Sequence, residues 1–167
     1  QAVAIRGLKR VVTEKVGRGF SLPPVTVTRT QTIGIVGAGP TGLTAAQDLA
    51  EAGYEVHLYE KMERLGGMMT AGIPPFRCPR SLLEEDIGRI LKHCPGIVPH
   101  LRCALGRDVT LDQLKERHGA VLLATGLWLD RNLKIPGEEP GLKGLHGIQF
   151  LIDVNRGEGM TLAGAVV

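Results

Sequence analysis

The segment TIGIVGAGPTGLTAAQDLAEAGYEVHLYE, residues 32–60, contains two short apolar stretches on either side of a glycine-rich turn and an alanine-rich stretch. Ile33, Ile35 and Val36 predict a strand that runs directly into GAGPTG, residues 37–42. Residues 43–52 are rich in Ala and Leu and predict a helix, and residues 54–59 predict a second strand that ends at Glu60. The order strand, glycine turn, helix, strand indicates an α/β domain built on a parallel sheet.

Further elements are expected on both sides of this segment. Residues 2–16 place apolar side chains at helical spacing between basic ones, which predicts a short amphipathic N-terminal helix stopped by Gly17 and Gly19. Residues 21–24 then form an extended linker. The later expectations are a helix over residues 81–93 with Ser81 as N-cap and Glu84 as capping-box partner, an edge strand over 97–105 interrupted by Pro99, a helix capped by Thr110, a buried strand over 120–124 and a helix over 148–155.

Composition narrows the classes of function. Of the 167 residues, 43% are hydrophobic and 22% charged, which is typical of a globular domain. A net charge of +3 without a dense Lys/Arg stripe, together with only 4% aromatic residues, argues against nucleic-acid binding. No apolar run reaches the ~18 residues of a membrane span. The three cysteines show no zinc or iron–sulfur spacing, so no metal site is predicted, and free thiols indicate a reducing cytoplasm.

The glycine turn predicts a site for a dinucleotide. Gly37 permits the tight turn, Gly39 lets the backbone lie against a pyrophosphate, and Gly42 lets the helix pack close to the sheet. Glu60 follows Gly42 by about 18 residues, near the ~20 expected for the acid that binds a ribose, and its charge would repel a 2′-phosphate. The turn therefore predicts a Rossmann-type unit holding the ADP half of a dinucleotide; the bland alternative is a glycine turn that binds nothing.

The glycines alone do not decide whether the bound dinucleotide is FAD or NAD, because both cofactors contain ADP. Two further features favour FAD. Gly66 and Gly67 follow the second strand and let the chain pass close to an elongated ligand, which an NAD enzyme needs less. Residues 124–126, Ala-Thr-Gly, end a later strand and offer a second place of close backbone approach.

Several motifs resemble one flavoprotein family. The segments VGAGPTGL, EKMERLGGMM, AGIPPFR, GRDVTLDQL, VLLATG and KIPGEE are similar, in this order, to the small (β) subunit of glutamate synthase and to its relatives, including the FAD portion of dihydropyrimidine dehydrogenase. AGIPPFR, residues 71–77, is more specific than the glycines. AVAIRGLKR, residues 2–10, resembles the helix that ends the family's N-terminal iron–sulfur domain.

The resemblance implies a flavin-dependent NAD(P)H oxidoreductase that passes electrons from NAD(P)H through FAD toward iron–sulfur clusters. It implies a Rossmann-like FAD-binding domain with a parallel sheet, incomplete and preceded by a short helix. A larger catalytic subunit or further domains of the same polypeptide would be its partners. The cofactor-binding residues that it implies are Gly37, Ala38, Gly39, Pro40, Thr41, Gly42, Glu60, Lys61, Arg64, Leu65, Gly66, Gly67, Met68, Arg77, Val109, Ala124, Thr125 and Gly126.

The chain also departs from the family. It lacks the cysteines that precede the AIRGLKR-like helix, and residues 162–167 (LAGAVV) coincide with the strand that leads into the family's second, NAD(P)H-binding glycine motif. We therefore expect a fragment, not active alone, in which residues 1–24 end an N-terminal helical domain and residues 31–167 form a truncated FAD-binding domain. The NAD(P)H site and the iron–sulfur clusters would lie outside this chain.

No side chain is predicted to act as a catalytic acid or base. The five histidines are scattered, and His57 is interpreted as structural. Disulfide reductases of the wider group carry a CxxxxC pair after the paired glycines, whereas this chain has only Cys78 there, so thiol–disulfide chemistry is not expected. Two alternatives remain: an NAD-binding dehydrogenase domain, or a non-catalytic nucleotide-binding partner subunit.

Overall fold

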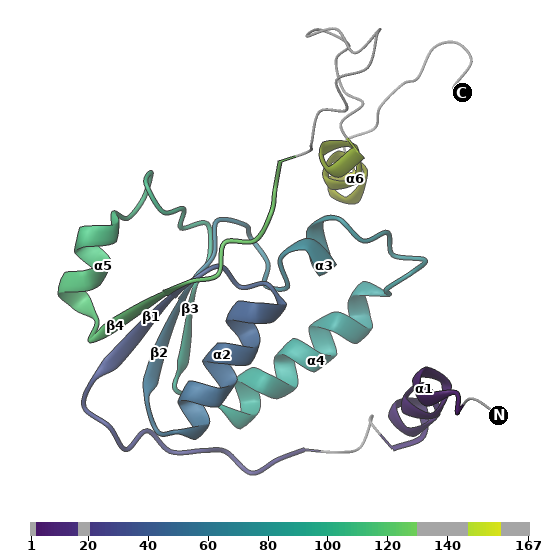
Figure 1. Cartoon of the computed structure of the whole chain (residues 1–167), viewed down its shortest axis with the longest axis horizontal. Coiled ribbons are helices and arrows are strands. Elements are labelled where there is room, and N and C mark those ends of the chain that lie inside the picture. Colours follow the sequence, from purple (N-terminus) through teal and green to yellow (C-terminus); the bar gives the residue numbers. More distant parts are fainter. Residues whose placement is uncertain (1–2, 17–20, 130–146, 158–167) are drawn as a thin grey trace, which may run out of the picture.

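A computed structural model describes residues 3–16, 21–129 and 147–157. Within them the chain forms a parallel sheet with helices against both faces (Figure 1). The elements in chain order are α1 (Ile5–Val16), β1 (Thr32–Val36), α2 (Pro40–Glu51), β2 (Glu55–Tyr59), α3 (Met68–Ala71), α4 (Arg80–His93), β3 (Ile97–His100), α5 (Leu111–Arg117), β4 (Ala120–Leu123) and α6 (Gly147–Arg156).

The sheet has the order β3-β2-β1-β4, and all of its strand pairs are parallel. From β1 the chain moves outward through β2 to β3, and then returns through α5 to place β4 on the other side of β1. Ile35 lies opposite Leu58 of β2 and Leu122 of β4. The predicted α/β fold with a parallel sheet is confirmed.

Alternation along the strands divides the core into two clusters. Ile35 and Leu58 are fully buried against α2 and α4 on one face. Their neighbours Val36 and Tyr59 point to the other face and pack with Leu114 of α5. The carboxyl ends of β1 and β2 are thus held from both sides, which fixes the position of the loops that follow them.

Several boundaries differ from the sequence prediction. Helix α2 begins at Pro40, inside the glycine motif, because proline at the first helical position needs no N–H partner. Strand β3 is an edge strand as expected, but it ends at His100.

Two capping predictions had opposite outcomes. The prediction of Ser81 as an N-cap is wrong, because α4 begins at Arg80, and Pro79 before it makes no side-chain cap. Glu84 does not complete a capping box and instead accepts a hydrogen bond from Arg64. Thr110 does cap α5, with Gln113 completing a reciprocal capping box.

The prediction that residues 120–124 form a buried strand is also wrong. Strand β4 lies at an edge of the described sheet, paired with β1 on one side. Leu122 and Leu123 are 38% and 52% exposed. An unbroken apolar run is typical of a strand covered on both faces, but among the described residues only Val121 of β4 packs against a core cluster, whereas Leu122 and Leu123 stay exposed.

The N-terminal amphipathic helix is confirmed as α1, and its apolar side chains are exposed; Ile5, Leu8 and Val12 are 57–63% exposed. The predicted helix near the C-terminal end is confirmed as α6, which packs on α3. None of the described helices has the length and apolar character needed to cross a bilayer. The predicted helix stop at residues 17–19, KIPGEE at residues 134–139 and LAGAVV at residues 162–167 lie outside the described residues.

Candidate functional site

The glycine turn sits where the chain changes direction within the sheet. The connection after β1 leads to β2 on one side of it, whereas the connection after β3 returns through α5 to place β4 on its other side, so the carboxyl end of β1 is a topological switch point. In open α/β sheets such a point leaves a crevice in which ligands bind. Residues 37–42 follow β1 there and open α2, as Figure 1 shows.

Two of the three motif glycines are required by packing inside the protein. Gly37 has φ +103, and its N–H donates to the carbonyl oxygen of Tyr59 at 2.8 Å. A Cβ at Gly37 would overlap the carbonyl oxygen of Ala124, and one at Gly42 would overlap the carbonyl oxygen of Gly37. The predicted steric roles of these two residues, a tight turn and close helix packing, are confirmed.

Gly39 is different, because protein packing does not require it to lack a side chain. Its φ of −74 and ψ of −175 are open to any L-residue. The nearest heavy atom to a Cβ built there is the Cα of Gly67, at 3.9 Å, an ordinary contact distance. The space directly beside the Gly39 Cα is therefore open in the protein, and the methyl group of an alanine would occupy it. This space lies at the first turn of α2, where helical N–H groups lack intrahelical partners.

Glu60 directly follows β2 and carries a buried carboxylate, with 3% of the residue exposed. The Ala38 N–H donates to its Oε2 at 2.9 Å, and the Met62 N–H donates to its Oε1 at 2.9 Å. The acid thus joins the glycine turn to the loop after β2. Each carboxylate oxygen can accept a further hydrogen bond, so these contacts leave Glu60 able to receive a hydroxyl.

The glycine turn, Glu60 and the end of β4 enclose a cavity of about 510 Å³, which we call the switch-point cavity. This volume is within the usual range for small-molecule sites. The structure brings together most of the predicted cofactor-binding residues here. They are Gly37, Gly39, Pro40, Thr41, Glu60, Lys61, Gly67, Met68, Ala124, Thr125 and Gly126.

The other predicted residues lie outside the lining of this cavity. Ala38, Gly42, Leu65 and Gly66 support it from behind; the Gly66 N–H, for example, donates to the carbonyl oxygen of Ala38 at 2.8 Å. Arg77 is exposed and borders neither this cavity nor the neighbouring one that Arg64 lines. Val109 is 3% exposed, and its carbonyl oxygen accepts from the Gly106 N–H.

Sequence reasoning missed several residues that line the switch-point cavity. Cys103, Ala104 and Leu105 form part of its wall, and a bridge from Leu105 to Val109 holds this segment. The GRDVT motif, residues 106–110, therefore predicted a loop that does contribute to the cavity wall, through the residues just before the motif. The other missed residues, with no motif to signal them, are Val36, Tyr59, Leu123 and Trp128.

Trp128 is the only tryptophan in the chain and lies directly over Lys61. The Lys61 Nζ is 3.6 Å from the centre of the indole ring, and the indole N–H donates to the carbonyl oxygen of Thr125 at 2.7 Å. Burial lowers the pKa of Lys61, while the Glu60 carboxylate acts in the opposite direction. This pair links the loop after β2 to the segment after β4 across the mouth of the cavity.

A second cavity of about 500 Å³ adjoins the first, and Lys61 and Gly67 border both. Its lining is rich in cations: Lys61, Arg64, Arg80, Arg102 and Arg156, against one acid, Glu63. Two of these arginines form exposed ion pairs, Arg64 with Glu84 and Arg102 with Glu63. The two cavities thus adjoin beside Gly67, one at the glycine turn and the other bordered by Ile152, Asn155 and Arg156 of α6.

The histidines that the prediction left without a catalytic role include a cluster on the α5 face of the sheet. His57 Nδ1 and His100 Nε2 are 2.9 Å apart, and His118 Nε2 lies 2.9 Å from the Tyr59 hydroxyl. Burial lowers the pKa of both His100 and His118, and nearby His57 lowers each further. His57 also contacts Glu55, consistent with the predicted structural role. None of these histidines borders the two cavities.

Comparison with known proteins agrees with this geometry. Residues 35–79 match the model of the NAD(P)-binding Rossmann-like domain family. The chain is 37% identical to the NADP(+)-dependent formate dehydrogenase subunit beta of Moorella thermoacetica, over 100% of this chain and 27% of that protein. It is 35% identical to the glutamate synthase [NADPH] small chain of Bacillus subtilis, over 87% of this chain and 29% of the relative.

A solved structure shows the same fold. FprA from Mycobacterium tuberculosis in complex with NADPH is 28% identical with a TM-score of 0.61, covering 66% of this chain and 26% of FprA. The fold, the glycine turn and Glu60 at the end of β2 thus define the chain as a Rossmann-type nucleotide-binding module, similar to parts of NAD(P)H-dependent oxidoreductases. More particularly, its resemblance to the glutamate synthase small-subunit family is confirmed, and the chain spans about a quarter of the length of the curated relatives it matches.

Proposed function

We propose that the chain is the FAD-binding module of an NAD(P)H-dependent oxidoreductase of the glutamate synthase small-subunit type, working in the cytoplasm. The observation that carries this proposal is the open position at Gly39. A glycine occupies a position where the fold itself would accept a side chain, and Glu60 lines the cavity beside it. A ligand backbone pressed against Gly39 explains both features.

The residues of the chain fit the ADP half of the cofactor. The backbone N–H groups of Thr41 and Gly42 in the first turn of α2, together with the positive end of the helix dipole, would point at the pyrophosphate; Pro40 has no N–H to donate. Glu60 would accept hydrogen bonds from the adenosine ribose hydroxyls. The wall at residues 103–105 would lie beside the adenine, with Val109 supporting it, and Thr125 and Gly126 would contact the cofactor from β4.

The choice of FAD rests on the path between the two cavities. The turn at Gly66 and Gly67 lies on the glycine motif, since a Cβ at Gly67 would come within 2.7 Å of the Gly39 Cα. Beyond Gly67 the second cavity continues. An elongated ligand that leaves the switch-point cavity here would run beside Gly67 and Met68, where we place the ribityl chain. Arg64 lines the second cavity, whereas the predicted contact of Arg77 would require that residue to approach the cofactor.

Bound FAD would supply hydride acceptance from NAD(P)H and single-electron release toward iron–sulfur clusters. The residues of this chain bind and orient the cofactor, and we assign none of them an acid or base role. We place the NAD(P)H site and the iron–sulfur clusters in other domains or in a larger partner subunit. Residues 1–24 would then form the end of an N-terminal helical domain, and residues 31–167 would belong to the FAD-binding domain. The exposed apolar side chains of α1 support the presence of a neighbouring domain that packs against this helix.

An NAD-binding dehydrogenase domain is the second candidate function. It is favoured by the match of residues 35–79 to an NAD(P)-binding family model. A non-catalytic nucleotide-binding subunit is a third candidate. All three use the glycine turn, so the identity of the bound dinucleotide separates the first two.

The test is reconstitution of the purified chain with FAD and, separately, with NAD. After removal of free ligand, the proposal expects visible flavin absorbance at one FAD per chain and displacement of FAD by ADP, because both would share the Gly39 site. Tight NAD binding by a colourless protein would support the dehydrogenase alternative instead. Binding of FAD without reductase activity in the completed enzyme would support the non-catalytic subunit.

A further inference from the structure

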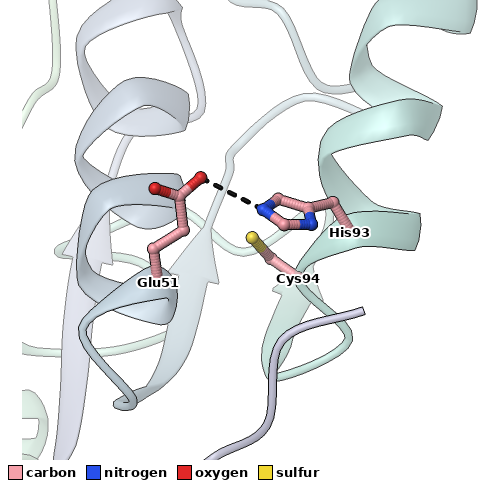
Figure 2. Close-up of side chains that lie close together, drawn as sticks. All are labelled: Glu51, His93 and Cys94. Carbon is pink, nitrogen blue, oxygen red and sulfur yellow. Dashed lines mark hydrogen bonds and ion pairs between the residues drawn. The ribbon is translucent and has the colours of Figure 1, made fainter. Parts of the chain in front are cut away.

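Three potential metal ligands meet at the end of the molecule that the proposed function does not use. Glu51 is the last residue of α2, His93 is the last residue of α4, and Cys94 follows it. One ligand atom from each lies within 4.8 Å of the other two. Figure 2 shows the three side chains converging between the ends of the two helices.

The hydrogen bonds of His93 leave one ring nitrogen directed at this group. Its Nδ1 lies 2.6 Å from the carbonyl oxygen of Pro23, which can only accept, so Nδ1 carries a proton and donates. Its Nε2 lies 3.2 Å from Glu51 Oε1, an acceptor as well. A cation between this nitrogen and the carboxylate oxygen would satisfy both acceptors. An Nδ1–H bound to a backbone carbonyl is the usual arrangement of a metal-ligating histidine.

Cys94 supplies a soft ligand that is shielded from solvent. The residue is 0% exposed, and its backbone N–H donates to the carbonyl oxygen of Ile90 at 2.8 Å, which fixes its position at the helix end. Burial raises the pKa of the thiol, and the Glu51 carboxylate adds to this effect. A divalent cation would reverse the electrostatics, since it favours the thiolate.

The surroundings favour a cation over other ligands. The C-terminal ends of α2 and α4 both point here, and each contributes partial negative charge. Gln47 Nε2 donates to Glu51 Oε1 at 2.8 Å and orients the carboxylate, as Pro23 orients His93. A cavity of about 180 Å³ is bordered by Gln47 and His93, beside this group.

We propose that Glu51, His93 and Cys94 bind a divalent transition metal of the zinc type, with water as fourth ligand. One carboxylate oxygen, one imidazole nitrogen and one thiolate sulfur are ligands that zinc accepts in tetrahedral sites. Bonds of about 2.0–2.3 Å place tetrahedral ligands roughly 3.3–3.8 Å apart, so the group must close slightly. Glu51 is exposed and can move. On binding, the Cys94 S–H bond breaks, a metal–sulfur bond forms, and the proton passes to solvent.

The site would act as a clamp and take no part in flavin chemistry. Helix α2 begins in the glycine motif and has 12 residues, so its two ends are about 18 Å apart. His93 also holds the segment before β1, because its carbonyl oxygen accepts from the Val25 N–H at 2.8 Å. The metal would therefore join α2, α4 and the linker at residues 21–25. Sequence spacing did not reveal it because Glu51 is distant from His93 in the chain.

The test is a titration of the reduced, chelator-treated 167-residue chain with Co²⁺, monitored by the thiolate-to-cobalt charge-transfer band. We expect one equivalent to produce the band and excess Zn²⁺ to remove it. Cys94→Ser should abolish the band, while the matched control Cys78→Ser should retain it. Glu51→Gln, at an exposed position that does not threaten folding, should weaken binding at least ~10-fold, because removing the charge of a direct ligand should cost no less than the ~10–100-fold typical of an outer-shell partner.

Thermal unfolding provides a second readout. Zn²⁺ should raise the Tm of the unmodified chain, because a ligand bound only to the folded state stabilises it, and should raise that of Glu51→Gln less. Absence of the band in the unmodified chain, a band that survives in Cys94→Ser, or equal affinity in Glu51→Gln would overturn the proposal.

Discussion

Gly39→Ala separates the demands of the fold from those of the cofactor. The new methyl group would meet the Gly67 Cα at 3.9 Å, and the backbone conformation, φ −74 and ψ −175, suits alanine. At such a position Gly→Ala typically stabilises a protein by about 0.4–1 kcal/mol, through the unfolded state. For a chain of this size that corresponds to a Tm raised by roughly 1–4 °C.

Cofactor binding should change in the opposite direction. The methyl group would occupy the space that we assign to the pyrophosphate, so at least one charge-assisted hydrogen bond from the turn to a phosphate oxygen is lost. Such a bond contributes about 1.5–3 kcal/mol. The expected result is a Kd for FAD that rises roughly 10- to 150-fold, while the fold is kept.

The assay combines calorimetric titration with FAD or ADP and thermal unfolding without ligand. Gly42→Ala is the matched control, because its Cβ would overlap the Gly37 carbonyl oxygen. It should lower the Tm by roughly 2–12 °C, from the ~1–3 kcal/mol that overpacking costs. If Gly39→Ala binds FAD as tightly as the unmodified chain, the reasoning about this position is refuted.

Three further predictions concern other parts of the chain. FAD should quench the fluorescence of Trp128, which lines the switch-point cavity; an unchanged spectrum at saturating FAD would contradict the proposed site. Thr110→Ala should lower the Tm through loss of ~0.5–2 kcal/mol of capping energy, whereas Ser81→Ala should not, because α4 has no side-chain cap. His100 and His118 have pKa values below the 6.5 of a free imidazole, so the unfolded state binds more protons and stability should fall as the pH drops below that value. The Tm measured at about pH 7.5 and about pH 5.5 checks this, and His100→Asn should reduce the difference; equal Tm values for the unmodified chain would contradict it.

Glu60 is a less clean test than Gly39, although the sequence marked it first. Its carboxylate accepts from the Ala38 and Met62 N–H groups, so Glu60→Ala would leave two partly or fully buried donors without a partner. Each such donor costs about 1–3 kcal/mol. Loss of cofactor in that variant would therefore combine a lost ribose contact with a disturbed glycine turn.

Local chemistry explains why much of the fold was predictable. Ile33, Ile35 and Val36 next to GAGPTG allow few arrangements other than a strand entering a helix. Glu60 at the end of the next strand then places an acid on the same edge of the sheet, because carboxyl ends of parallel strands meet there. Thr110 was predictable as a cap because its partner, Gln113, is only three residues away.

One failure is local, and the others depend on contacts between distant segments. Ser81 fits the pattern of an N-cap, but α4 starts one residue earlier, after a proline. Leu122 and Leu123 read as buried, yet burial depends on what packs against an edge strand. The cation–π contact of Lys61 with Trp128 joins the loop after β2 to the segment after β4. Nothing in the sequence near either residue indicates that the two side chains meet.

The most direct measurement is a crystal structure of the chain with FAD. The account predicts that the pyrophosphate lies against the Gly39 backbone at the first turn of α2, with the adenosine ribose hydroxyls donating to Glu60. A complex in which FAD lies elsewhere, while the space beside Gly39 stays open and Glu60 contacts only Ala38 and Met62, would contradict it.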